Sequence, residues 1–589
     1  MKNIVDLTRY ALPYKKHIIL AVFGMVIQVA VAFFIPYIMQ FILQNALEVR
    51  NVELIVLLSV VMLLLALLGI AAGIMNTYSS QYISQHAVAE LRLDLFNKIQ
   101  TLSFRNIDDF KTSRLITNAT NDMVRVQMFF SMLLRMVIRA PMMIAVGLVF
   151  ALSTSVQLSQ VFFITMPLLI ISILIIMAFA YPRFRRVQRS LDDLNNTVLE
   201  NANAPQVVKS FVSQPHESER FENTNENYRQ ANTSAESLMA FAEPVIFLIF
   251  NLGVALILLF GARYFGEGHP AFFTDTGVAR VPLLVAFNQY SQQILIGLMM
   301  FAMMIIFISR ADVSAARINE IFHAEIDLDN PDDGKHLTLA GAIRFDDVSF
   351  GYGANGNQVL KNINLTINPG EKVGIIGSTG SGKSSLVTLI PRLYDPTRGT
   401  IYLDDHKLTN LDIPRLREQI GFVTQQATLF SGSLATNIMQ GNEDATLDEL
   451  ETAAKDALIH DFASESEAYY NHIVRAKGTN LSGGQKQRLS IARALVRKPT
   501  ILILDDATSA VDLASERKIL RAINKLTYNP TLLMISQKVA SVRRMDRIVV
   551  LDNEGKIDGV GTHETLMTDS KVYREIAESQ LDLGGETHG

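Results

Sequence analysis

Long stretches without a single charged side chain fill the first half of this sequence. Asp, Glu, Lys and Arg are all absent from Ile18–Leu47, from Leu54–Ala89 and from Ala140–Pro182. A helix of roughly 20 apolar residues crosses the core of a bilayer, which is about 30 Å thick. The runs are therefore long enough to be membrane-spanning helices, and we expect the chain to cross a membrane several times.

The apolar runs divide into six predicted spans. The longest of the three runs contains the polar segment Ser153–Gln160 and is therefore divided into two spans. Two further charge-free runs, Pro244–Ala262 and Val281–Ser309, give the fifth and sixth spans. The first run follows Lys15 and Lys16 but has no small-residue cleavage site, which favours a retained span over a signal peptide. The predicted spans are residues 18–43, 54–77, 138–155, 160–182, 242–263 and 281–308.

The basic residues predict the orientation of these spans, because Lys and Arg collect on the cytoplasmic side of membrane proteins. Lys2, Arg9, Lys15 and Lys16 precede the first span, and Arg183–Arg189 follows the fourth. With six spans in the plasma membrane, the N-terminus and everything after residue 308 are expected to be cytoplasmic. The predicted outer loops are short, at residues 44–53, 153–160 and 263–280.

Two long polar connections, residues 90–139 and 183–243, are predicted on the cytoplasmic side. Both have helix-like patterns, and the second span is expected to continue as a helix into water. Phe104–Leu115 and Asn203–Phe211 lie near the midpoints of the two connections. We predict that they are the tips of helical hairpins, with Phe110 as an aromatic anchor in the first tip; solvated loops are the alternative.

The composition changes after Arg310, where hydropathy falls and charged residues become frequent. We predict a membrane domain at 1–310, a linker with helical character at 311–340, an α/β domain at 341–580 and a tail at 581–589. The net charge of −4 argues against nucleic acid as a partner. The absence of cysteine excludes disulfides and thiol chemistry.

A phosphate-binding loop is predicted in the second half of the chain. The segment GSTGSGKS lies between an apolar run typical of a buried strand and a periodic segment typical of a helix. In that context the glycines let backbone N–H groups close around phosphates at a helix N-terminus. Lys383 is expected to reach the β- and γ-phosphates of ATP, and Ser384 to bind Mg²⁺. The residues expected to contact ATP here are Gly377, Ser378, Thr379, Gly380, Ser381, Gly382, Lys383, Ser384 and Ser385.

Two more segments belong with this loop. ILILDD, residues 501–506, is a buried-strand pattern that ends in carboxylates, and Asp505 fits the role of an Mg²⁺ ligand.

LSGGQ, residues 481–485, precedes a helical pattern and forms a second helix N-terminus that is suited to bind an anion. One nucleotide does not need two such sites, so this loop is predicted to contact ATP bound by another subunit. Its contacting residues are Ser482, Gly483, Gly484 and Gln485.

The order of these motifs resembles the nucleotide-binding domain of ABC transporters. FGYG, GSTGSGKS, FVTQQ, LSGGQKQR, ILILDD and SAVD follow one another as they do in that family. Six spans before this domain resemble the exporter half-transporters of the multidrug type. The resemblance implies a helical membrane domain with long cytoplasmic helical extensions, joined to an α/β P-loop ABC nucleotide-binding domain.

The resemblance also implies roles for single residues. Tyr352 would stack on adenine, and Gln425 would contact Mg²⁺ and relay to the membrane domain. The LSGGQ loop would close over the γ-phosphate held by a partner chain. The segments Thr120–Asp122 and Val207–Phe211 resemble that family's intracellular loops, which implies that the two hairpin tips dock on ATPase domains.

Three positions depart from the family pattern. Asp506 stands where the family has the glutamate that orients the attacking water, and Gln537 stands where it has a histidine. Glutamine can donate a hydrogen bond but cannot carry a proton. Arg475-Ala476 replaces the usual Gly-Glu before LSGGQ, which puts that segment's contact with the partner in doubt.

The first two departures reduce hydrolysis while leaving the residues that bind Mg·ATP in place. This combination resembles the degenerate subunit of heterodimeric ABC exporters; tolerated drift is the alternative for Asp506 alone. The predicted catalytic residues are Asp506, Gln537 and Gln425, and the predicted Mg²⁺ ligands are Ser384, Gln425 and Asp505.

The predicted function is ATP-driven export of amphipathic or drug-like molecules by a heterodimer. Its second chain is expected to carry the glutamate and the histidine. A lipid flippase, a peptide exporter and an importer on the same fold are alternatives that differ in cargo. A regulatory ATPase or a membrane scaffold is an alternative of another class, since only a transporter's ATP hydrolysis should respond to cargo. Candidate cargo contacts are Glu243, Asn288, Gln289, Gln292, Gln293, Met299, Met300, Phe301, Met303 and Met304.

Overall fold

The chain folds into two compact units in a computed structural model. The structure describes residues 2–47, 50–269, 272, 281–331, 335, 337–353 and 358–585. The membrane unit comprises Met1–Gln100 with Ser113–His323, and the second unit comprises Thr101–Thr112 with Ala324–Gly589. Most of the predicted outer loop at 263–280, and parts of the predicted linker and tail, lie outside the described residues.

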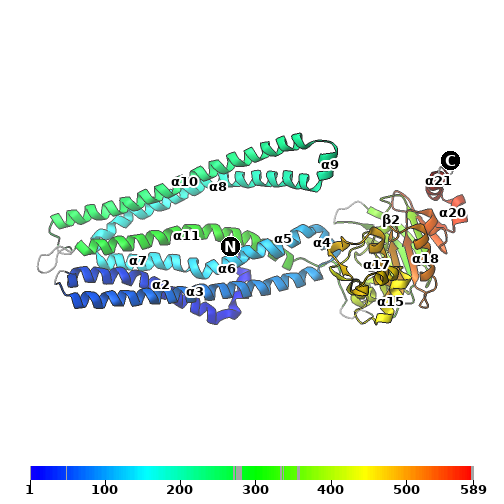
Figure 1. The fold of residues 1–589 in the computed structure, drawn as a ribbon, viewed down its shortest axis with the longest axis horizontal. Coiled ribbons are helices and arrows are strands. Elements are labelled where there is room, and N and C mark those ends of the chain that lie inside the picture. Colours follow the sequence, from blue (N-terminus) through cyan, green and yellow to red (C-terminus); the bar gives the residue numbers. More distant parts are fainter. Residues whose placement is uncertain are drawn as a thin grey trace. The chain divides into compact units, whose positions relative to one another are not determined.

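The membrane unit is helical in every described element (Figure 1). η1 is a 3₁₀ helix, and η2, η3 and η4 are π-helical segments. The elements are α1 (Lys2–Leu7), η1 (Thr8–Tyr14), α2 (Lys15–Phe41), η2 (Ile42–Leu47), α3 (Val52–Thr101), α5 (Thr112–Thr117), η3 (Asn118–Asp122), α6 (Met123–Met132), η4 (Leu133–Val137), α7 (Arg139–Thr154), α8 (Val156–Asn203), α9 (Pro205–Ser210), α10 (Gln214–Gly266) and α11 (Val281–Phe322).

Several of these helices are much longer than a bilayer is thick. α3 has 50 residues, which at 1.5 Å per residue is about 75 Å. The helix therefore continues well past residue 77, the predicted end of the second span; that its extension lies in water stays a prediction. α11 likewise continues past residue 310, the predicted end of the membrane domain, to Phe322.

Five stretches of the described residues are helical, long and apolar enough to cross a membrane. They are Asn3–Leu47, Val52–Thr101, Thr112–Thr154, Val156–Asn203 and Gln214–Gly266. The sixth predicted span, 281–308, lies in α11, where the side chains of several residues are outside the described part. That span stays a prediction.

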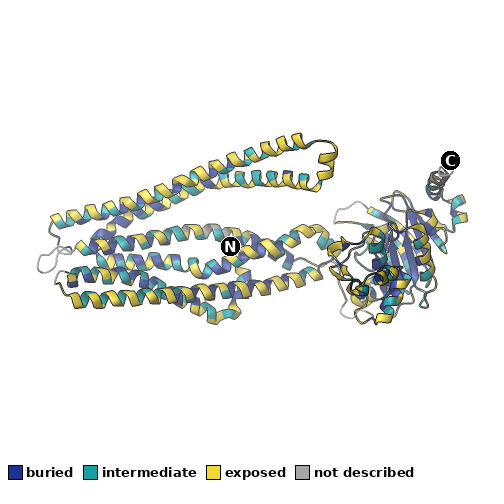
Figure 2. Ribbon diagram, viewed as in Figure 1, coloured by how far each residue is buried: buried dark blue, intermediate teal, exposed yellow. Residues whose placement is uncertain are grey.

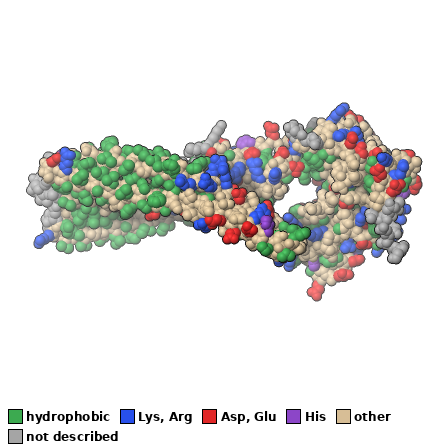
Figure 3. All heavy atoms as spheres, turned by 90° about the horizontal axis from the view of Figure 1, so that it is seen from above, with side chains coloured by type: hydrophobic (Ala, Val, Ile, Leu, Met, Phe, Trp, Pro, Cys, Tyr) green, Lys and Arg blue, Asp and Glu red, His purple; other side chains and the backbone are tan. Residues whose placement is uncertain are grey.

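Much of the apolar surface of the membrane unit is exposed. The most apolar part of α3 has no buried residue, and exposed residues follow the outer faces of the long helices (Figure 2). Figure 3 shows an almost continuous apolar surface on the face in view, with Lys and Arg side chains gathered where it ends. Such an apolar surface is expected of helices that face lipid. A helix suits this environment, because its backbone polar groups are hydrogen-bonded within the helix and do not need water.

α8 and α10 form a long antiparallel hairpin whose tip is the short helix α9 (Figure 1). Near the tip, Glu200 pairs with Arg220 at 2.7 Å, and Asn201 Nδ2 donates to Glu217 Oε2 at 2.8 Å. Val207, Phe211 and Val212 expose their apolar side chains there. The hairpin therefore has its tip at the second predicted site, Asn203–Phe211.

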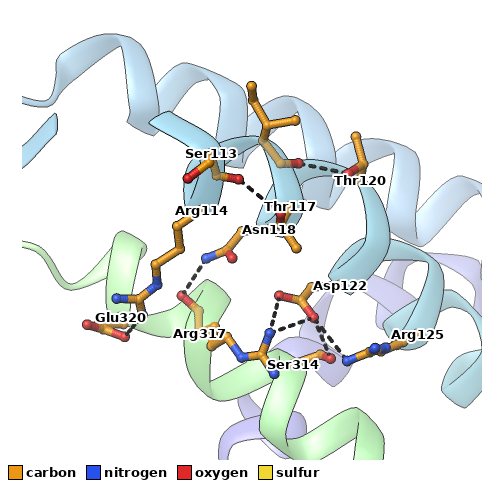
Figure 4. A network of polar contacts seen from close by, with 11 residues as sticks. Ser113, Arg114, Thr117, Asn118, Thr120, Asp122, Arg125, Ser314, Arg317 and Glu320 are labelled. Atoms are coloured by element: carbon orange, nitrogen blue, oxygen red, sulfur yellow. Dashed lines mark hydrogen bonds and ion pairs between the residues drawn. The ribbon is translucent and has the colours of Figure 1, made fainter. Parts of the chain in front are cut away.

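Asp122 is a buried carboxylate that joins η3 to α11 (Figure 4). Ser314 Oγ donates to its Oδ1 at 2.7 Å, and Arg317 Nη1 lies 3.3 Å from its Oδ2. Arg125 lies 3.7 Å from Oδ1. Asp122 is buried, whereas the side chains of Arg317 and Arg125 are 37% and 52% exposed, so the loss of its partners would leave a buried carboxylate uncompensated. The contact is therefore a strong link between two elements far apart in the sequence.

The second unit is an α/β domain that also includes α4 (Phe104–Phe110). Its helices are α12 (Lys383–Thr388), η6 (Leu408–Asn410), α13 (Ile413–Glu418), α14 (Leu434–Met439), α15 (Leu447–Asp456), α16 (His460–Glu465), η7 (Tyr469–Asn471), η8 (Ala476–Gly478), α17 (Gly483–Leu495), α18 (Leu513–Ile523), α19 (Val539–Val542), α20 (His563–Asp569) and α21 (Lys571–Gly585). Its strands are β1 (Ile343–Gly351), β2 (Gln358–Ile367), β3 (Lys372–Gly377), β4 (Arg398–Leu403), β5 (His406–Lys407), β6 (Ile420–Val423), β7 (Gly432–Ser433), β8 (Ile473–Val474), β9 (Ile501–Asp505), β10 (Thr531–Ile535), β11 (Arg547–Leu551) and β12 (Ile557–Gly561).

The larger sheet of this unit positions the candidate site. Its strand order is β12-β11-β3-β10-β9-β6, and only β12 is antiparallel to its neighbour. β9 and β10 are buried along their whole length, as strands of a covered parallel sheet are. Ile535 pairs with both Ile375 and Asp505, so the carboxyl ends of β3, β9 and β10 meet at one edge. The domain also contains a smaller antiparallel sheet, β2-β1-β4-β5, and the two-stranded antiparallel sheet β7-β8.

Candidate nucleotide-binding site

The loop between β3 and α12 has the geometry of a phosphate-binding loop. Gly380 and Gly382 have φ angles of 87° and 90°, a left-handed conformation that residues with a Cβ rarely adopt. Lys383 begins α12 and folds back over the loop, where its Nζ donates to Gly377 O at 2.9 Å and to Ser378 O at 2.7 Å. Burial lowers the pKa of the Lys383 ammonium, against the opposing effect of Asp506 and Asp505.

Two carboxylates at the end of β9 face this loop. Ser384 Oγ donates to Asp505 Oδ1 at 2.9 Å. Burial raises the pKa of Asp505, while the hydrogen bond from Ser384 lowers it. Asp506 follows with a φ of 48° and donates its backbone N–H to Ile535 O at 3.1 Å. Burial raises the pKa of Asp506 as well, and Lys538 lowers it. Both carboxyls thus lie in a partly desolvated site that favours a bound cation.

Residues from the separate motifs line one hollow. It has about 760 Å³ of empty space and is partly open to solvent. Gln425 Nε2 lies 3.4 Å from Asp506 Oδ2 at its wall. Sequence reasoning missed the apolar members Val359 and Ile535. The lining residues are Val359, Thr379, Gly380, Gly382, Lys383, Ser384, Ser385, Gln425, Asp505, Asp506, Ile535 and Gln537.

The LSGGQ loop does not line this hollow. Ser482 caps α17, with its Oγ accepting from Gln485 N at 3.3 Å and its N–H donating to Gln485 Oε1 at 2.8 Å. A Cβ at Gly484 would lie 3.0 Å from Ala510 O, so the helix start is closely packed. The loop therefore forms a capped helix N-terminus that takes no part in the hollow of its own chain.

Tyr352 lies beside the phosphate-binding loop without lining the hollow. Its hydroxyl and Ser385 Oγ are 3.0 Å apart, and the residue is 41% exposed. Its ring packs against Phe350 and, edge-on at 5.3 Å, against Tyr394. The exposed part of the ring is available for stacking on a base.

Tyr394 also contacts α4, the first predicted hairpin tip. Its hydroxyl donates to Asp108 Oδ2 at 2.8 Å, and its ring centre lies 6.1 Å from that of Phe104. Burial and the bond to Asp108 raise the pKa of the Tyr394 hydroxyl, which stays protonated. Phe110, the predicted anchor, is half-buried at the end of α4, and its role stays a prediction. Sequence reasoning missed Tyr394 and Asp108, because a single Tyr and a single Asp in polar segments carry no pattern.

A second missed contact supports the phosphate-binding loop. Ser378 Oγ donates to Asn553 Oδ1 in the turn between β11 and β12. In the same turn, Gly555 O accepts from Lys361 N at 2.8 Å. The turn between β11 and β12 is therefore hydrogen-bonded both to the phosphate-binding loop and to β2.

Comparison with known proteins places this site in a family. Residues 18–299 match the model of the ABC transporter transmembrane region, and residues 360–509 match that of the ABC transporter domain. The uncharacterized ABC transporter ATP-binding protein YfiB of Bacillus subtilis is 37% identical over 97% of this chain and 98% of its own length. The chain belongs to the ABC transporters.

Two further relatives extend the comparison. YgaD of Bacillus subtilis, whose name assigns it provisionally to multidrug export, is 29% identical over 96% of this transporter and 97% of its own length. The structure of a bacterial Atm1-family ABC exporter with ATP bound covers 98% of this transporter and 99% of its own chain, with a TM-score of 0.79 and 22% identity. That likeness shows the fold alone.

This ABC transporter carries its membrane region and its ATP-binding domain in one chain, as half-transporters do, and half-transporters dimerise. It is a multi-pass membrane protein that binds ATP and couples it to transport. The predicted fold class, a helical membrane domain with long helices and an α/β ABC domain, is confirmed.

Replacing Tyr394 by Phe tests the contact with α4 in this transporter. The substitution keeps the ring but removes the donor to Asp108, and a hydrogen bond to a charged group is worth about 1.5–3 kcal/mol. We expect amide exchange in residues 104–110 to become roughly tenfold faster, measured by hydrogen–deuterium exchange. Tyr402→Phe on β4 is the matched control, because the described residues include no hydrogen-bond partner for its hydroxyl and its ring, which lies under the Arg344 guanidinium, is kept. Unchanged exchange in 104–110 would show that the hydroxyl does not hold α4.

Proposed function

We propose that this chain binds Mg·ATP and is the degenerate-site subunit of a heterodimeric ABC exporter. ATP binding rests on the hollow around Lys383, Ser384 and Asp505. The backbone N–H groups of residues 377–385 and the Lys383 ammonium would hold the phosphates. The exposed ring of Tyr352 would stack on the adenine.

The donor groups in the hollow fit Mg²⁺. Ser384 Oγ and Asp505 Oδ1 are 2.9 Å apart, and the Gln425 side chain lies at the same wall. Hydroxyl, carboxylate and amide oxygens are the ligands that this cation prefers. When bound, Mg²⁺ would neutralise the charge of the phosphates, with Ser384, Gln425 and Asp505 as its protein ligands.

The observation that carries the degenerate assignment is the pair Asp506 and Gln537 in one hollow. Asp506 is one methylene shorter than the family's glutamate, and a misplacement of about 1 Å can lower a rate ~10²-fold. Gln537 can donate a hydrogen bond to the γ-phosphate but cannot exchange a proton. The site would thus hold ATP while turning it over slowly.

The position of the LSGGQ loop supports a composite arrangement with a partner chain. Ser482, Gly483 and Gly484 are absent from the hollow of their own chain, and their helix start is free to meet another nucleotide. The partner would then supply the glutamate and the histidine for that second site. Fast turnover would occur on the partner's ATP, capped by this chain's LSGGQ.

The proposed cargo is an amphipathic or drug-like molecule that leaves through the plasma membrane. The name of YgaD, which refers to multidrug export, supports this class. A lipid flippase or a peptide exporter on the same fold is the alternative.

The proposed orientation places the N-terminus and the ATP-binding domain in the cytoplasm. It rests on the basic residues before the first span and after the fourth.

Restoring the two family residues in the purified chain tests the proposal. Asp506→Glu combined with Gln537→His is expected to raise the steady-state ATPase rate of the lone chain at least tenfold, because both sites of a homodimer would regain a catalytic group. Adding Lys383→Ala should remove the gained activity, which shows that it arises at this site. If the wild-type chain already hydrolyses ATP as fast as the double variant, the degenerate assignment is wrong.

A further inference from the structure

A hollow in the membrane unit lies between the segment η3–α6 and α11. It has about 810 Å³ of empty space, partly open to solvent. No residue of the nucleotide site takes part in it. We call it the α6–α11 hollow, and its lining residues are Asn121, Val124, Arg125, Met128, Phe129, Phe307, Arg310 and Ala311.

The charge of the α6–α11 hollow is positive. Among the described residues, two guanidinium groups line it, those of Arg125 and Arg310, and no carboxylate does. Among the residues that the structure describes, Arg310 has no ion pair. The acid nearest to Arg125 is Asp122 at 3.7 Å, which already accepts from Ser314 and lies 3.3 Å from Arg317 (Figure 4). One carboxylate thus serves two arginines, and Arg310 adds a charge that no described acid compensates.

The rest of the lining is apolar. The floor is formed by Phe129, which is 6% exposed, and by buried Ala311. Met128, which is 50% exposed, and Val124 stand at the rim with Phe307. Met and Phe side chains give adaptable apolar surfaces. The hollow therefore places two positively charged side chains beside an apolar surface.

The α11 side of the α6–α11 hollow lies near the predicted cytoplasmic end of the sixth span, and its α6 side lies in the predicted cytoplasmic connection before the third span. Phe307 and Arg310 flank residue 308, the predicted cytoplasmic end of the sixth span. In the elements that follow α6, Arg135 of η4 is exposed, and the Nε of Arg139 at the start of α7 is buried with no hydrogen-bond partner among the described residues. The headgroup of an anionic amphiphile in the hollow would meet the guanidinium groups of Arg125 and Arg310, while its apolar body lies against Phe129 and Met128. Glu243, one of the candidate cargo contacts, does not line the hollow.

We propose that the α6–α11 hollow binds anionic amphiphiles, molecules with one carboxylate, sulfate or phosphate on an apolar body, as cargo before export. This deepens the proposed export function and rests on it. Guanidinium groups suit such headgroups, because their fork of N–H donors matches carboxylate and phosphate oxygens. Cationic amphiphiles would be repelled by the same groups.

Photo-crosslinking of the full chain in phosphatidylcholine vesicles tests this site. The probe is a diazirine-bearing C14 fatty acid, and the comparison probe is the primary amine of the same length and diazirine position. We expect the acid to crosslink to peptides of α6 and α11 with saturation, and the amine not to. Arg310→Gln should weaken the acid's apparent affinity about tenfold, and Arg310→Gln with Arg125→Gln about 100-fold, at ~1.4 kcal/mol per tenfold change. Arg310→Lys, which keeps the charge, should stay within a few-fold of the wild type.

Three results would overturn the proposal: equal labelling by the amine, labelling spread over all helices, or no loss of affinity in the glutamine variants.

Vesicles that contain phosphatidylglycerol show whether the bound headgroup belongs to a membrane lipid or to cargo. If this lipid displaces the probe fully, the hollow is a lipid site and the cargo assignment fails. Photolabelling by an ATP analogue in each variant checks folding independently. Crosslinking at the hollow without stimulation of the transporter's ATPase by the acid would contradict the export function and leave the anion site standing.

Discussion

Replacing Gly484 by Asp is expected to lower the ATP turnover of the assembled transporter roughly 10³-fold. In the composite arrangement, Gly484 of this chain faces the γ-phosphate held by the partner. Two like charges about 4 Å apart repel by ~4 kcal/mol at an effective dielectric constant near 20, and each ~1.4 kcal/mol changes a rate tenfold. The measurement is the steady-state ATPase rate of the complex purified through a tag on this chain.

The matched control for this variant is Gly484→Asn, which has nearly the same shape without the charge. Both side chains must accommodate the Ala510 carbonyl oxygen, since a Cβ at position 484 lies 3.0 Å from it. We expect the Asn variant to keep a rate within about tenfold of the wild type. If Asp and Asn lower turnover equally, packing rather than charge explains the loss, and the loop does not face a phosphate.

Replacing Lys383 by Ala is expected to weaken ATP binding to this chain at least ~100-fold. The Lys383 ammonium is the only side-chain cation that lines the described hollow. It also holds the phosphate-binding loop in shape through Gly377 O and Ser378 O. Hydrogen bonds to charged groups are worth about 1.5–3 kcal/mol each, so the loss of two or more accounts for the effect. Titration with a photoreactive ATP analogue measures it.

Lys407→Ala serves as the control for that titration. Lys407 lies on β5, away from the hollow, and is exposed. Its removal lowers the charge of the domain by the same amount but should leave labelling unchanged. Labelling of the Lys383→Ala variant at wild-type concentrations would show that residues 377–385 do not hold the phosphates.

The residues that the sequence brought out most clearly are those whose chemistry requires a fixed local pattern. The glycines of GSTGSGKS are needed because Gly380 and Gly382 have left-handed φ angles. Asp505 could be placed because a run of buried strand residues ends at it, and the carboxyl ends of neighbouring parallel strands meet at one edge. Gln425 and Gln537 followed only from the resemblance, since a lone glutamine after a strand is compatible with many roles.

Contacts between segments far apart in the chain could not be predicted from the sequence pattern. Tyr394 and Asp108 come from segments far apart in the chain, and neither segment has a periodicity that would mark its partner. The same holds for Asp122: the resemblance of Thr120–Asp122 to the family's intracellular loops did not indicate that Asp122 is buried against Ser314 and Arg317.

The end of the membrane unit was hard to place for another physical reason. Charged residues from Arg310 onward mark the exit from the bilayer, but they do not end a helix. α11 therefore continues to Phe322, and the compact unit reaches His323. The anchoring of the following segment on α4, where Asn106 Nδ2 donates to Glu325 O at 3.1 Å, could not be read from composition.

The most direct test of the asymmetric assignment is the ATPase rate of the Asp506→Asn variant in the transporter purified from its own host through a tag on this chain. If this chain contributes only a slow site, the carboxylate of Asp506 supports little of the turnover. We expect the rate to fall less than about threefold, in contrast to the collapse expected of Gly484→Asp in the same preparation. A fall of about 100-fold or more would contradict the account, because it would show that Asp506 serves a working catalytic site.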